Sequence, residues 1–273
     1  MSLLDLLFSQ YRWKQAERGT SVLAEERRIQ LLQWSQHEGR IDAVDAASRL
    51  NVAIETVRRD LDTLQRRGLI RRVHGGAIAL GRMQHESNWS ERQASHAEGK
   101  LRIAALAAQQ VPEAGAIFVD GGTTTQLLAE YLRDKPLLLV VTNSIPLGNQ
   151  VADSGTPVHL LSGRLRATTL SALGSRTVAD IAGFRADMVF LGTNGVDAKL
   201  GFTTSDPEEA AVKQAFIANA RETVVLADSG KFGRVFPAAF AMPKDIDRLI
   251  TDIDAPHVAV EALVTAGVEV VLA

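Results

Sequence analysis

Glycines and threonines between Asp120 and Thr125 form the stretch of this chain best suited to holding an anion. The stretch reads Asp-Gly-Gly-Thr-Thr-Thr and joins a predicted strand to a helix predicted to begin near Thr124. Glycines let the backbone approach a ligand closely, amides at a helix start point outward, and hydroxyls add donors. An ordinary strand-to-helix turn is the alternative reading. The residues predicted to contact a phosphate here are Asp120, Gly121, Gly122, Thr123, Thr124 and Thr125.

Further polar side chains lie at or beyond the ends of the strands predicted after this loop. Parallel strands end at one edge of their sheet, and ligands bind at that edge in open α/β sheets. We therefore expect these groups to bind sugar hydroxyls or a second anionic group. A solvated surface position, a helix cap or a local ion pair is the alternative for each charged residue. The candidates are Asn143, Ser144, Gly163, Arg164, Asp206, Lys213, Asp228 and Lys231.

A second set of candidates lies on a helix predicted from Ile54 to about Arg67. Its apolar face is formed at 3.6-residue spacing by Ile54, Val57, Leu61 and Leu64. If the helix enters a major groove by its N-terminus, Glu55, Thr56 and Arg59 lie nearest the base edges. Arg58 is better placed for phosphate. The residues predicted to contact DNA are Glu55, Thr56, Arg58, Arg59, Arg66, Arg71, Arg72 and His74.

The elements around that helix predict a winged helix-turn-helix over residues 22–80. Two more helices precede it, from Ala24 to Gly39 and from Val44 to Leu50, with a turn at 51–53. Two short β-prone stretches then surround Gly75 and Gly76, which is the pattern of a small hairpin, or wing. Such a hairpin can reach the DNA backbone beside the recognition helix.

Residues 100–273 predict a larger domain of the α/β class. Short apolar runs alternate there with amphipathic helical segments, which is typical of βαβ units in a mostly parallel, Rossmann-like sheet. The runs are Ala116–Val119, Leu137–Val141, Val158–Leu161, Met188–Leu191, Thr223–Leu226, Arg248–Thr251 and Val268–Leu272. Residues 1–21 predict an N-terminal extension, and residues 81–99 predict a polar linker.

The charges divide unevenly along the chain. Residues 22–82 hold eleven Lys and Arg against eight Asp and Glu, a balance of +3, and residues 83–273 hold sixteen against twenty-two, a balance of −6. Only the first part is mildly suited to a polyanion such as DNA.

The chain has no cysteine, which excludes disulfides and fits a reducing compartment. No run reaches membrane-spanning length, so we expect a cytoplasmic protein without a membrane partner.

Four stretches of the first domain closely resemble the DNA-binding signature of DeoR-family repressors. They are Glu26-Arg27-Arg28-Ile29, Leu50-Asn51-Val52-Ala53, Thr56 to Leu64 and Gly68 to Ala77. The order of the polar loops behind the linker also resembles the family's C-terminal sensor domain, whose fold is similar to ribose-5-phosphate isomerase. The resemblance implies that these loops recognise a phosphorylated sugar. It departs at Ala53, where the family commonly has a serine N-cap; the loss weakens the helix start by about 1 kcal/mol.

A phosphosugar isomerase-like enzyme with an attached DNA-binding domain is the alternative function, since such an enzyme needs a carboxylate base at its substrate. The segment Gly192-Thr193-Asn194-Gly195-Val196-Asp197 lacks the adjacent carboxylate pair of the isomerases, and only Asp197 remains as a base. No histidine cluster has metal-ligand spacing, and no Ser/His/Asp arrangement can be defended. We therefore predict no enzyme activity, no cofactor and no metal site. The size of the acidic second domain disfavours a purely architectural DNA-binding protein.

These observations together predict a DNA-binding transcriptional regulator that represses a sugar-metabolism operon. Its predicted partners are double-stranded operator DNA and a phosphorylated sugar effector. Helix-turn-helix proteins read paired half-sites as dimers, which predicts at least a homodimer. The resemblance implies that a homotetramer is also an option, and that the effector weakens operator binding.

Overall fold

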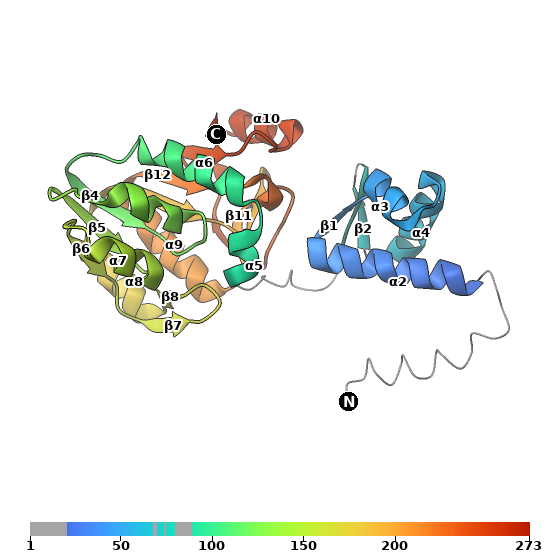
Figure 1. Ribbon diagram of the computed structural model, residues 1–273, viewed down its shortest axis with the longest axis horizontal. Helices are drawn as coiled ribbons and strands as arrows, with labels where there is room; N and C mark the ends of the chain where they lie inside the picture. The colour runs from blue at the N-terminus through green and yellow to red at the C-terminus, as the bar shows by residue number, and fades with distance from the viewer. Residues whose placement is uncertain (1–20, 68–69, 74, 80–88) are drawn as a thin grey trace. The chain divides into compact units, whose positions relative to one another are not determined.

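The computed structural model describes residues 21–67, 70–73, 75–79 and 89–273, which form two compact units, one within residues 1–85 and one within residues 86–273 (Figure 1). The predicted extension apart from Ser21, the wing residue His74 and the linker residues 81–88 lie outside the described residues. Each unit has a hydrophobic core of its own.

The first unit is a winged helix-turn-helix, as predicted. Its elements are α2 (Ser21–Glu38), β1 (Arg40–Asp42), α3 (Ala43–Leu50), α4 (Ile54–Arg66), β2 (Ile70–Val73) and β3 (Gly76–Ala79). The three strands form an antiparallel sheet in the order β1, β3, β2. The short β1 was not predicted, because only Ile41 in it is buried and three residues carry no periodic signal. Leu31, Ile41, Val57 and Leu61 pack together in the core of this unit.

The ends of α3 and α4 are set by local backbone chemistry. The Asp42 carboxylate caps α3 by accepting hydrogen bonds from the amides of Val44 (2.8 Å) and Asp45 (3.2 Å). Asn51 ends α3 in the left-handed region, at φ 51°, a conformation that asparagine tolerates better than most residues. Ala53 is the N-cap of α4 and makes no side-chain capping bond. The sequence therefore located this weakened helix start correctly.

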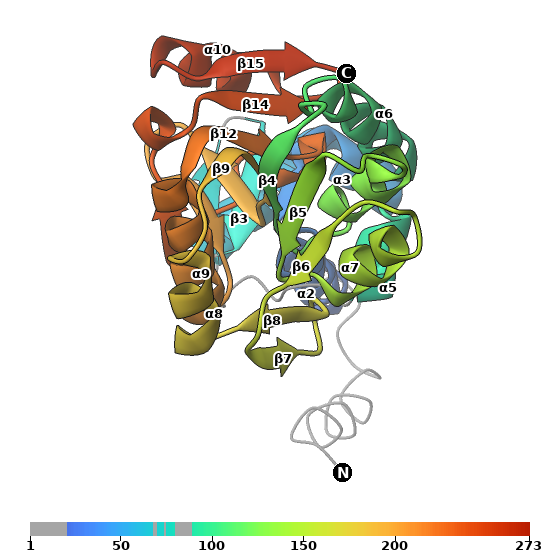
Figure 2. The same cartoon turned by 90° about the vertical axis from the view of Figure 1, so that its left-hand side faces the viewer.

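The second unit is built on a seven-stranded sheet in which every neighbouring pair is parallel, as its seven apolar runs predicted (Figure 2). In spatial order the strands are β15 (Glu269–Leu272), β14 (Arg248–Thr251), β12 (Ala220–Leu226), β9 (Ala186–Gly192), β4 (Gly115–Val119), β5 (Leu138–Thr142) and β6 (Val158–Leu160). Phe118 of β4 packs into one core, whereas its neighbours Ile117 and Val119 pack into another. The central strands are therefore buried on both faces, which explains their continuous apolar sequences.

Helices cover both faces of this sheet. The helices of this unit are α5 (Trp89–Ala94), α6 (Ala97–Ala108), the 3-10 helix η2 (Thr125–Leu132), α7 (Ile145–Ala152), α8 (Ser175–Ile181), α9 (Pro207–Asn219) and α10 (His257–Thr265). The core on one face joins side chains of α6, η2 and α7, and the core on the other joins side chains of α8, α9 and α10. Residues 89–99 were predicted as linker, but α5 and the start of α6 occupy most of this stretch.

Smaller elements complete the second unit. The hairpin of β7 (Arg164–Arg166) and β8 (Ser171–Leu173) follows β6. A second sheet joins β10 (Gly195–Asp197), β11 (Gly201–Thr204) and β13 (Ala238–Ala241), and two single 3-10 turns are η3 (Ser229–Lys231) and η4 (Pro243–Asp245). None of these short elements was predicted.

Candidate functional site

The predicted recognition helix α4 separates an apolar face from a charged one. Val57, Leu61 and Leu64 are buried, as predicted, and Ile54 is half-buried. On the other side Glu55, Arg58, Arg59 and Arg66 are exposed, and Thr56 is half-buried. Packing of the buried face against α2 and α3 therefore presents the charged face to solvent.

The exposed charges of α4 are only loosely engaged by the protein. Arg58 pairs with Glu55 one turn earlier, and the Arg66 guanidinium donates to the Thr63 hydroxyl at 2.9 Å. The guanidinium of Arg59 makes no ion pair within the described residues. Exposed pairs of this kind contribute at most about 1 kcal/mol. A polyanionic partner can therefore displace them at little cost.

The wing places one of its three predicted residues, Arg72, against α4. Arg71 is exposed on β2. Arg72 donates to the Arg58 carbonyl at 3.2 Å and lies 3.5 Å from the Asp62 carboxylate, so β2 is tied to α4. The third residue, His74, lies outside the described residues.

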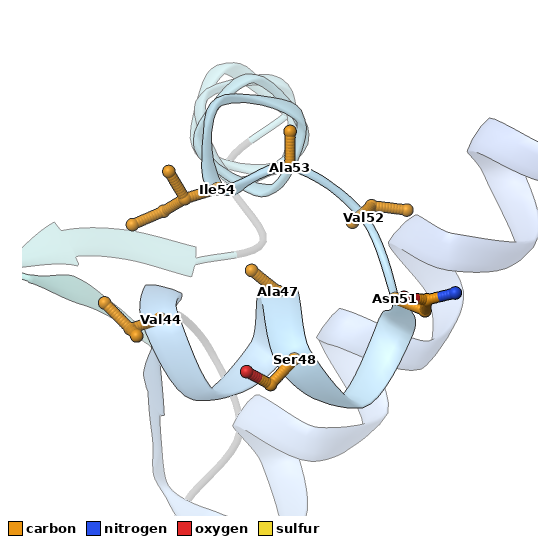
Figure 3. Close-up of a pocket in the computed structure, with 7 residues that line it drawn as sticks. All are labelled: Val44, Ala47, Ser48, Asn51, Val52, Ala53 and Ile54. Carbon is orange, nitrogen blue, oxygen red and sulfur yellow. The ribbon is translucent and has the colours of Figure 1, made fainter.

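An open pocket lies at the helix-turn-helix turn (Figure 3). Its lining comes from α3, from residues 51–53 and from Ile54, the first residue of α4. Val44 in this lining is 63% exposed. The pocket is thus a partly apolar hollow directly before Glu55 and Thr56, the first two residues predicted to reach base edges.

Asp60 is a structural residue of α4 that the sequence analysis did not single out. It is 3% exposed, and its two carboxylate oxygens accept hydrogen bonds from Arg27 (2.5 Å) and Arg28 (3.0 Å) of α2. A buried carboxylate requires such partners because its desolvation is costly. Asp60 therefore fixes the orientation of α4 on α2.

In the second unit, the predicted phosphate loop follows β4 at the C-terminal edge of the sheet. Gly121 is buried, and a Cβ placed on it would lie 1.8 Å from the Ser171 hydroxyl, so only glycine fits there. Its amide donates to the Asn143 side chain at 3.0 Å, and that side chain donates to the Ala172 carbonyl at 3.3 Å. The loop is thereby joined to the end of β5 and to β8.

The amides of Gly122, Thr123 and Thr124 remain without an acceptor within the described part of the chain. Thr124 is 6% exposed. The Thr125 hydroxyl donates to the Gly122 carbonyl at 3.1 Å, which closes the turn into η2. Backbone amides that are shielded from water normally have partners. The loop therefore offers a group of donors at the start of a helix, which is the arrangement that binds phosphate in many proteins.

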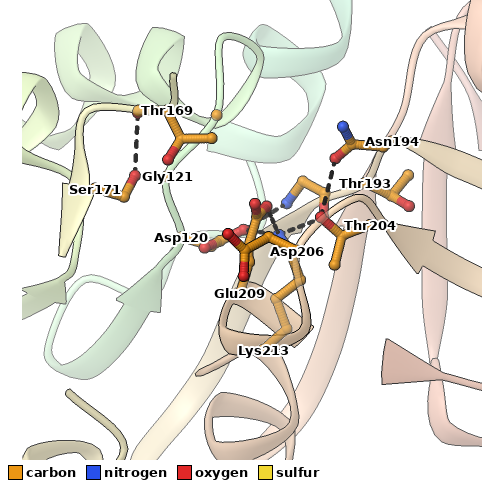
Figure 4. A network of polar contacts seen from close by, with 12 residues as sticks. Asp120, Gly121, Thr169, Ser171, Thr193, Asn194, Thr204, Asp206, Glu209 and Lys213 are labelled. Carbon is orange, nitrogen blue, oxygen red and sulfur yellow. Dashed lines mark hydrogen bonds and ion pairs between the residues drawn. The ribbon is translucent and has the colours of Figure 1, made fainter. Parts of the chain in front are cut away.

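A buried network of charges lies beside this loop (Figure 4). Lys213 of α9 and Asp120 at the end of β4 are each 1% exposed and form an ion pair. Lys213 also donates to the Gly192 carbonyl at 2.9 Å and lies 3.4 Å from Glu209. Burial lowers the pKa of Lys213, but the charges and hydrogen bonds of Asp120 and Glu209 outweigh burial and raise the pKa above its usual value. Lys213 therefore carries a fully compensated charge.

The network continues to the β7–β8 hairpin through Arg166. Its guanidinium pairs with Asp206 at 3.0 Å and with Glu209 at 3.3 Å. Asp206 also caps α9 by accepting from the Glu208 amide at 2.8 Å. The sequence analysis missed Arg166 and Glu209, whose partners in this network include residues more than forty positions away.

Four of the predicted site residues make structural contacts within the protein. Arg164 starts β7 rather than ending a strand of the main sheet, and its side chain is 59% exposed and pairs with Glu208. Gly163 packs at φ 151° against Thr177 of α8. Ser144 caps α7 through the Leu147 amide. Asp120, for which a helix cap was the alternative, instead pairs with Lys213.

A second polar group lies where β12 ends. Asp228 is 1% exposed and caps η3 through the Gly230 amide at 3.1 Å, while its Oδ2 lies 3.9 Å from the Lys231 ammonium. Lys100 of α6, which the sequence analysis did not select, is also 1% exposed. Burial lowers the pKa of Lys100 to about 8; Asp228 opposes this shift, whereas Lys231 and Arg92 add to it.

The segment expected to hold the base of an isomerase has a different use. The Asp197 carboxylate accepts hydrogen bonds from the amides of Lys199 (2.8 Å) and Leu200 (2.9 Å), which forms the turn between β10 and β11.

Among the described residues, no group of three His, Asp or Glu side chains is placed to hold a metal ion. No described helix is both long and apolar enough to cross a membrane.

Comparison with known proteins covers both units. Residues 27–82 match the family model of the DeoR-like helix-turn-helix domain, and residues 95–253 match that of the DeoR C terminal sensor domain. The chain is 37% identical to the uncharacterized transcriptional regulator FruR of Bacillus subtilis over 75% of this chain and 81% of that protein. It is 34% identical to the transcriptional regulator GlpR of Haloferax volcanii over 92% and 98% of the two chains.

Two further matches extend this comparison. The glycerol-3-phosphate regulon repressor of Escherichia coli is 30% identical over 85% of this chain and 92% of its own. Among solved structures, ribose 5-phosphate isomerase A from Methanocaldococcus jannaschii matches half of this chain and 55% of its own, at 19% identity and a TM-score of 0.38. A likeness of that size defines no fold, so the α/β assignment depends on the strand order described above.

Proposed function

Because the chain belongs to the DeoR family of transcriptional regulators, we propose that it represses sugar-metabolism genes and leaves their operator when a phosphorylated sugar binds its sensor unit. One observation carries the proposal about the ligand. The amides of Gly122, Thr123 and Thr124 lack protein acceptors within the described residues, at the edge of the sheet where α/β domains bind ligands. A phosphate placed there would accept these hydrogen bonds.

The buried ion network supports this loop rather than competing for the ligand. Lys213 already has two carboxylates and a carbonyl as partners, so its charge has little left to offer an effector. We assign Asp120 and Lys213 the role of holding the loop against α9. Asp228 is the better candidate for contact with the rest of the effector, because its buried Oδ2 accepts no hydrogen bond within the described residues, and Lys231 lies 3.9 Å from that oxygen.

The first unit supports the assignment of DNA contacts. Glu55, Thr56 and Arg59 lie on the exposed side at the start of α4, where they can reach base edges. The remaining predicted contacts, with phosphates, are those of Arg58, Arg66, Arg71, Arg72 and His74. Paired half-sites would be read by at least a dimer.

The name of one relative supports a phosphorylated ligand. That relative is the glycerol-3-phosphate regulon repressor of Escherichia coli. We propose that the sensor binds its sugar without converting it, because Asp197 is used in a turn. Isomerase assays on the sugar phosphates that bind are the check on this point.

A thermal-shift screen of phosphorylated sugars tests the proposed ligand class, with Thr124→Val as the site variant. A true effector at 100 times its Kd should stabilise the protein by about 2.7 kcal/mol. Thr124→Val removes one hydroxyl and keeps the side-chain shape, so it should weaken effector binding by about 1–3 kcal/mol. It should leave affinity for DNA unchanged when no sugar is present.

Thr265→Val is the matched control, because Thr265 is exposed at the end of α10 and its hydroxyl donates within that helix. This variant should bind the effector like the wild type. Equal effector binding by the wild type and both variants would contradict the placement of the phosphate at the loop after β4.

A further inference from the structure

Helix α5 is the first described element of the sensor unit after the linker residues 81–88. It is six residues long, and none of its side chains is buried. Isolated helices of this length are unstable in water. Since no buried apolar face holds it, α5 depends on polar contacts with the rest of the unit.

The first of these contacts runs to the hairpin of β7 and β8. The Arg92 guanidinium lies over the Trp89 ring at 5.7 Å and donates to the Thr168 carbonyl at 2.6 Å. Thr168 lies between the two strands of the hairpin. The same hairpin carries Ser171, which packs against Gly121, so α5 is tied to the segment that contacts the proposed phosphate loop.

The second contact runs to the polar group at the end of β12. The Lys100 ammonium donates to the Arg92 carbonyl of α5. The next residues also touch this region, because a Cβ on Gly230 would lie 2.8 Å from the His96 imidazole, between α5 and α6. Lys100 and the loop of Asp228 therefore meet at the end of α5.

The partner of Lys100 is a weak one for a buried ammonium. Burial lowers its pKa to about 8, so its surroundings do not fully compensate its charge. The Arg92 carbonyl is a neutral acceptor and brings no opposite charge to this ammonium. A sugar oxygen of the effector that entered beside Asp228 and Lys231 would therefore compete with the neutral Arg92 carbonyl for this ammonium.

We propose that α5 transmits the state of the sensor to the DNA-binding unit, and that Arg92 and Lys100 are the positioning residues that hold it in the DNA-binding state. Effector binding takes Lys100 from the Arg92 carbonyl and releases α5, which continues directly into the linker. This inference deepens the proposed function, because it depends on an effector binding at this edge of the sheet. It adds the route by which binding changes the affinity for DNA.

Two substitutions in the full-length chain test the route without any effector. Arg92→Met removes the donor to Thr168, and Lys100→Met removes the donor to Arg92 while keeping a buried apolar chain. Gln93→Met, at an exposed position of α5, is the control. The probe is the duplex that the wild type selects from a random pool. We expect each variant to bind it at least tenfold more weakly than Gln93→Met and to show faster amide exchange over residues 89–96.

Conservative substitutions distinguish a positioning role of these side chains from a general loss of stability. Arg92→Lys keeps a cationic donor and should recover most of the affinity for the duplex. If Lys100→Met fails to fold, the variants at the half-buried Arg92 still test whether α5 controls the affinity for DNA. Affinities of Arg92→Met and Arg92→Lys within twofold of Gln93→Met would overturn the proposal.

Binding and amide exchange measured with a set of phosphate compounds test this inference separately from the proposed function. The compounds are glycerol 3-phosphate, fructose 1-phosphate, fructose 6-phosphate and inorganic phosphate. A sugar phosphate that binds the wild type should raise amide exchange over residues 89–96. Binding without that change would overturn the route and leave the proposed ligand class intact. Binding by none of them would count against the ligand class, and the substitutions above would still decide the role of α5.

Discussion

The two units use charged side chains in opposite ways. On α4 the charges are exposed and loosely paired, as with Arg58 and Glu55, so a partner can take them over. At the edge of the sensor sheet the charges of Asp120 and Lys213 are buried and bonded to each other. Charged residues are therefore available to bind a partner in the first unit, whereas they stabilise the fold in the second unit. Burial of the side chains accounts for this difference.

Removal of one partner from the buried network should give the largest effect. Lys213→Met leaves the Asp120 and Glu209 carboxylates buried without their shared cation, a change that typically costs about 3–5 kcal/mol. Urea unfolding of the sensor unit, followed by circular dichroism, measures this loss. Lys199→Met, at an exposed position, should change the free energy of unfolding by no more than about 0.5 kcal/mol. Similarly small changes in the free energy of unfolding of both variants would contradict the proposal that the network stabilises the sensor unit.

Lys100 should make the stability of the sensor unit depend on pH. Its pKa is about 8 in the folded protein, compared with the ordinary value of 10.5 for a lysine exposed to water. Between these values the unfolded chain binds more protons, so the free energy of unfolding rises with pH. The gain relative to Lys100→Met, which cannot titrate, should reach about 3 kcal/mol by pH 10.5 and be absent below pH 7. Parallel pH profiles of the two proteins would show that Lys100 titrates normally.

The exposed charges should affect binding and leave stability unchanged. Arg59→Ala should lose about 1–3 kcal/mol of preference for the selected duplex over a random one, because it removes a base contact. Arg58→Ala should weaken both complexes together, because it removes a phosphate contact. Titrations of both duplexes measure this difference. An unchanged ratio of affinities in Arg59→Ala would remove that residue from base reading.

The smallest effect concerns the start of the recognition helix. Ala53→Ser would supply a hydroxyl that accepts from the amide of Glu55 or Thr56, and should stabilise the first unit by about 1 kcal/mol. Asp42→Ala removes an existing cap from α3 in the same unit and should shift stability by a similar amount in the opposite direction. Thermal unfolding of the first unit compares the two. Equal signs for both changes would contradict the capping geometry.

The sequence predicted the parts of the fold that depend on local signals. The central parallel strands are apolar on both faces, and α3 and α4 have a clear helical periodicity. The hairpin of β7 and β8 could not be predicted, because strands of three residues are too short to show a clear alternating pattern. The same limit applies to the site. Asp120 and Lys213 were selected by type, but their pairing, and the roles of Glu209 and Arg166, depend on contacts between residues far apart in sequence.

The affinity of the full-length protein for its selected duplex, measured with and without sugar phosphates, tests the central claim most directly. A ligand alters DNA affinity only if it binds the two states of the protein differently, typically by a factor of about 5–150. We predict that at least one phosphorylated sugar raises the Kd for the duplex by such a factor, and that its unphosphorylated parent has no effect. A Kd that stays within twofold for every sugar phosphate, or that responds equally to the unphosphorylated sugar, would contradict the account.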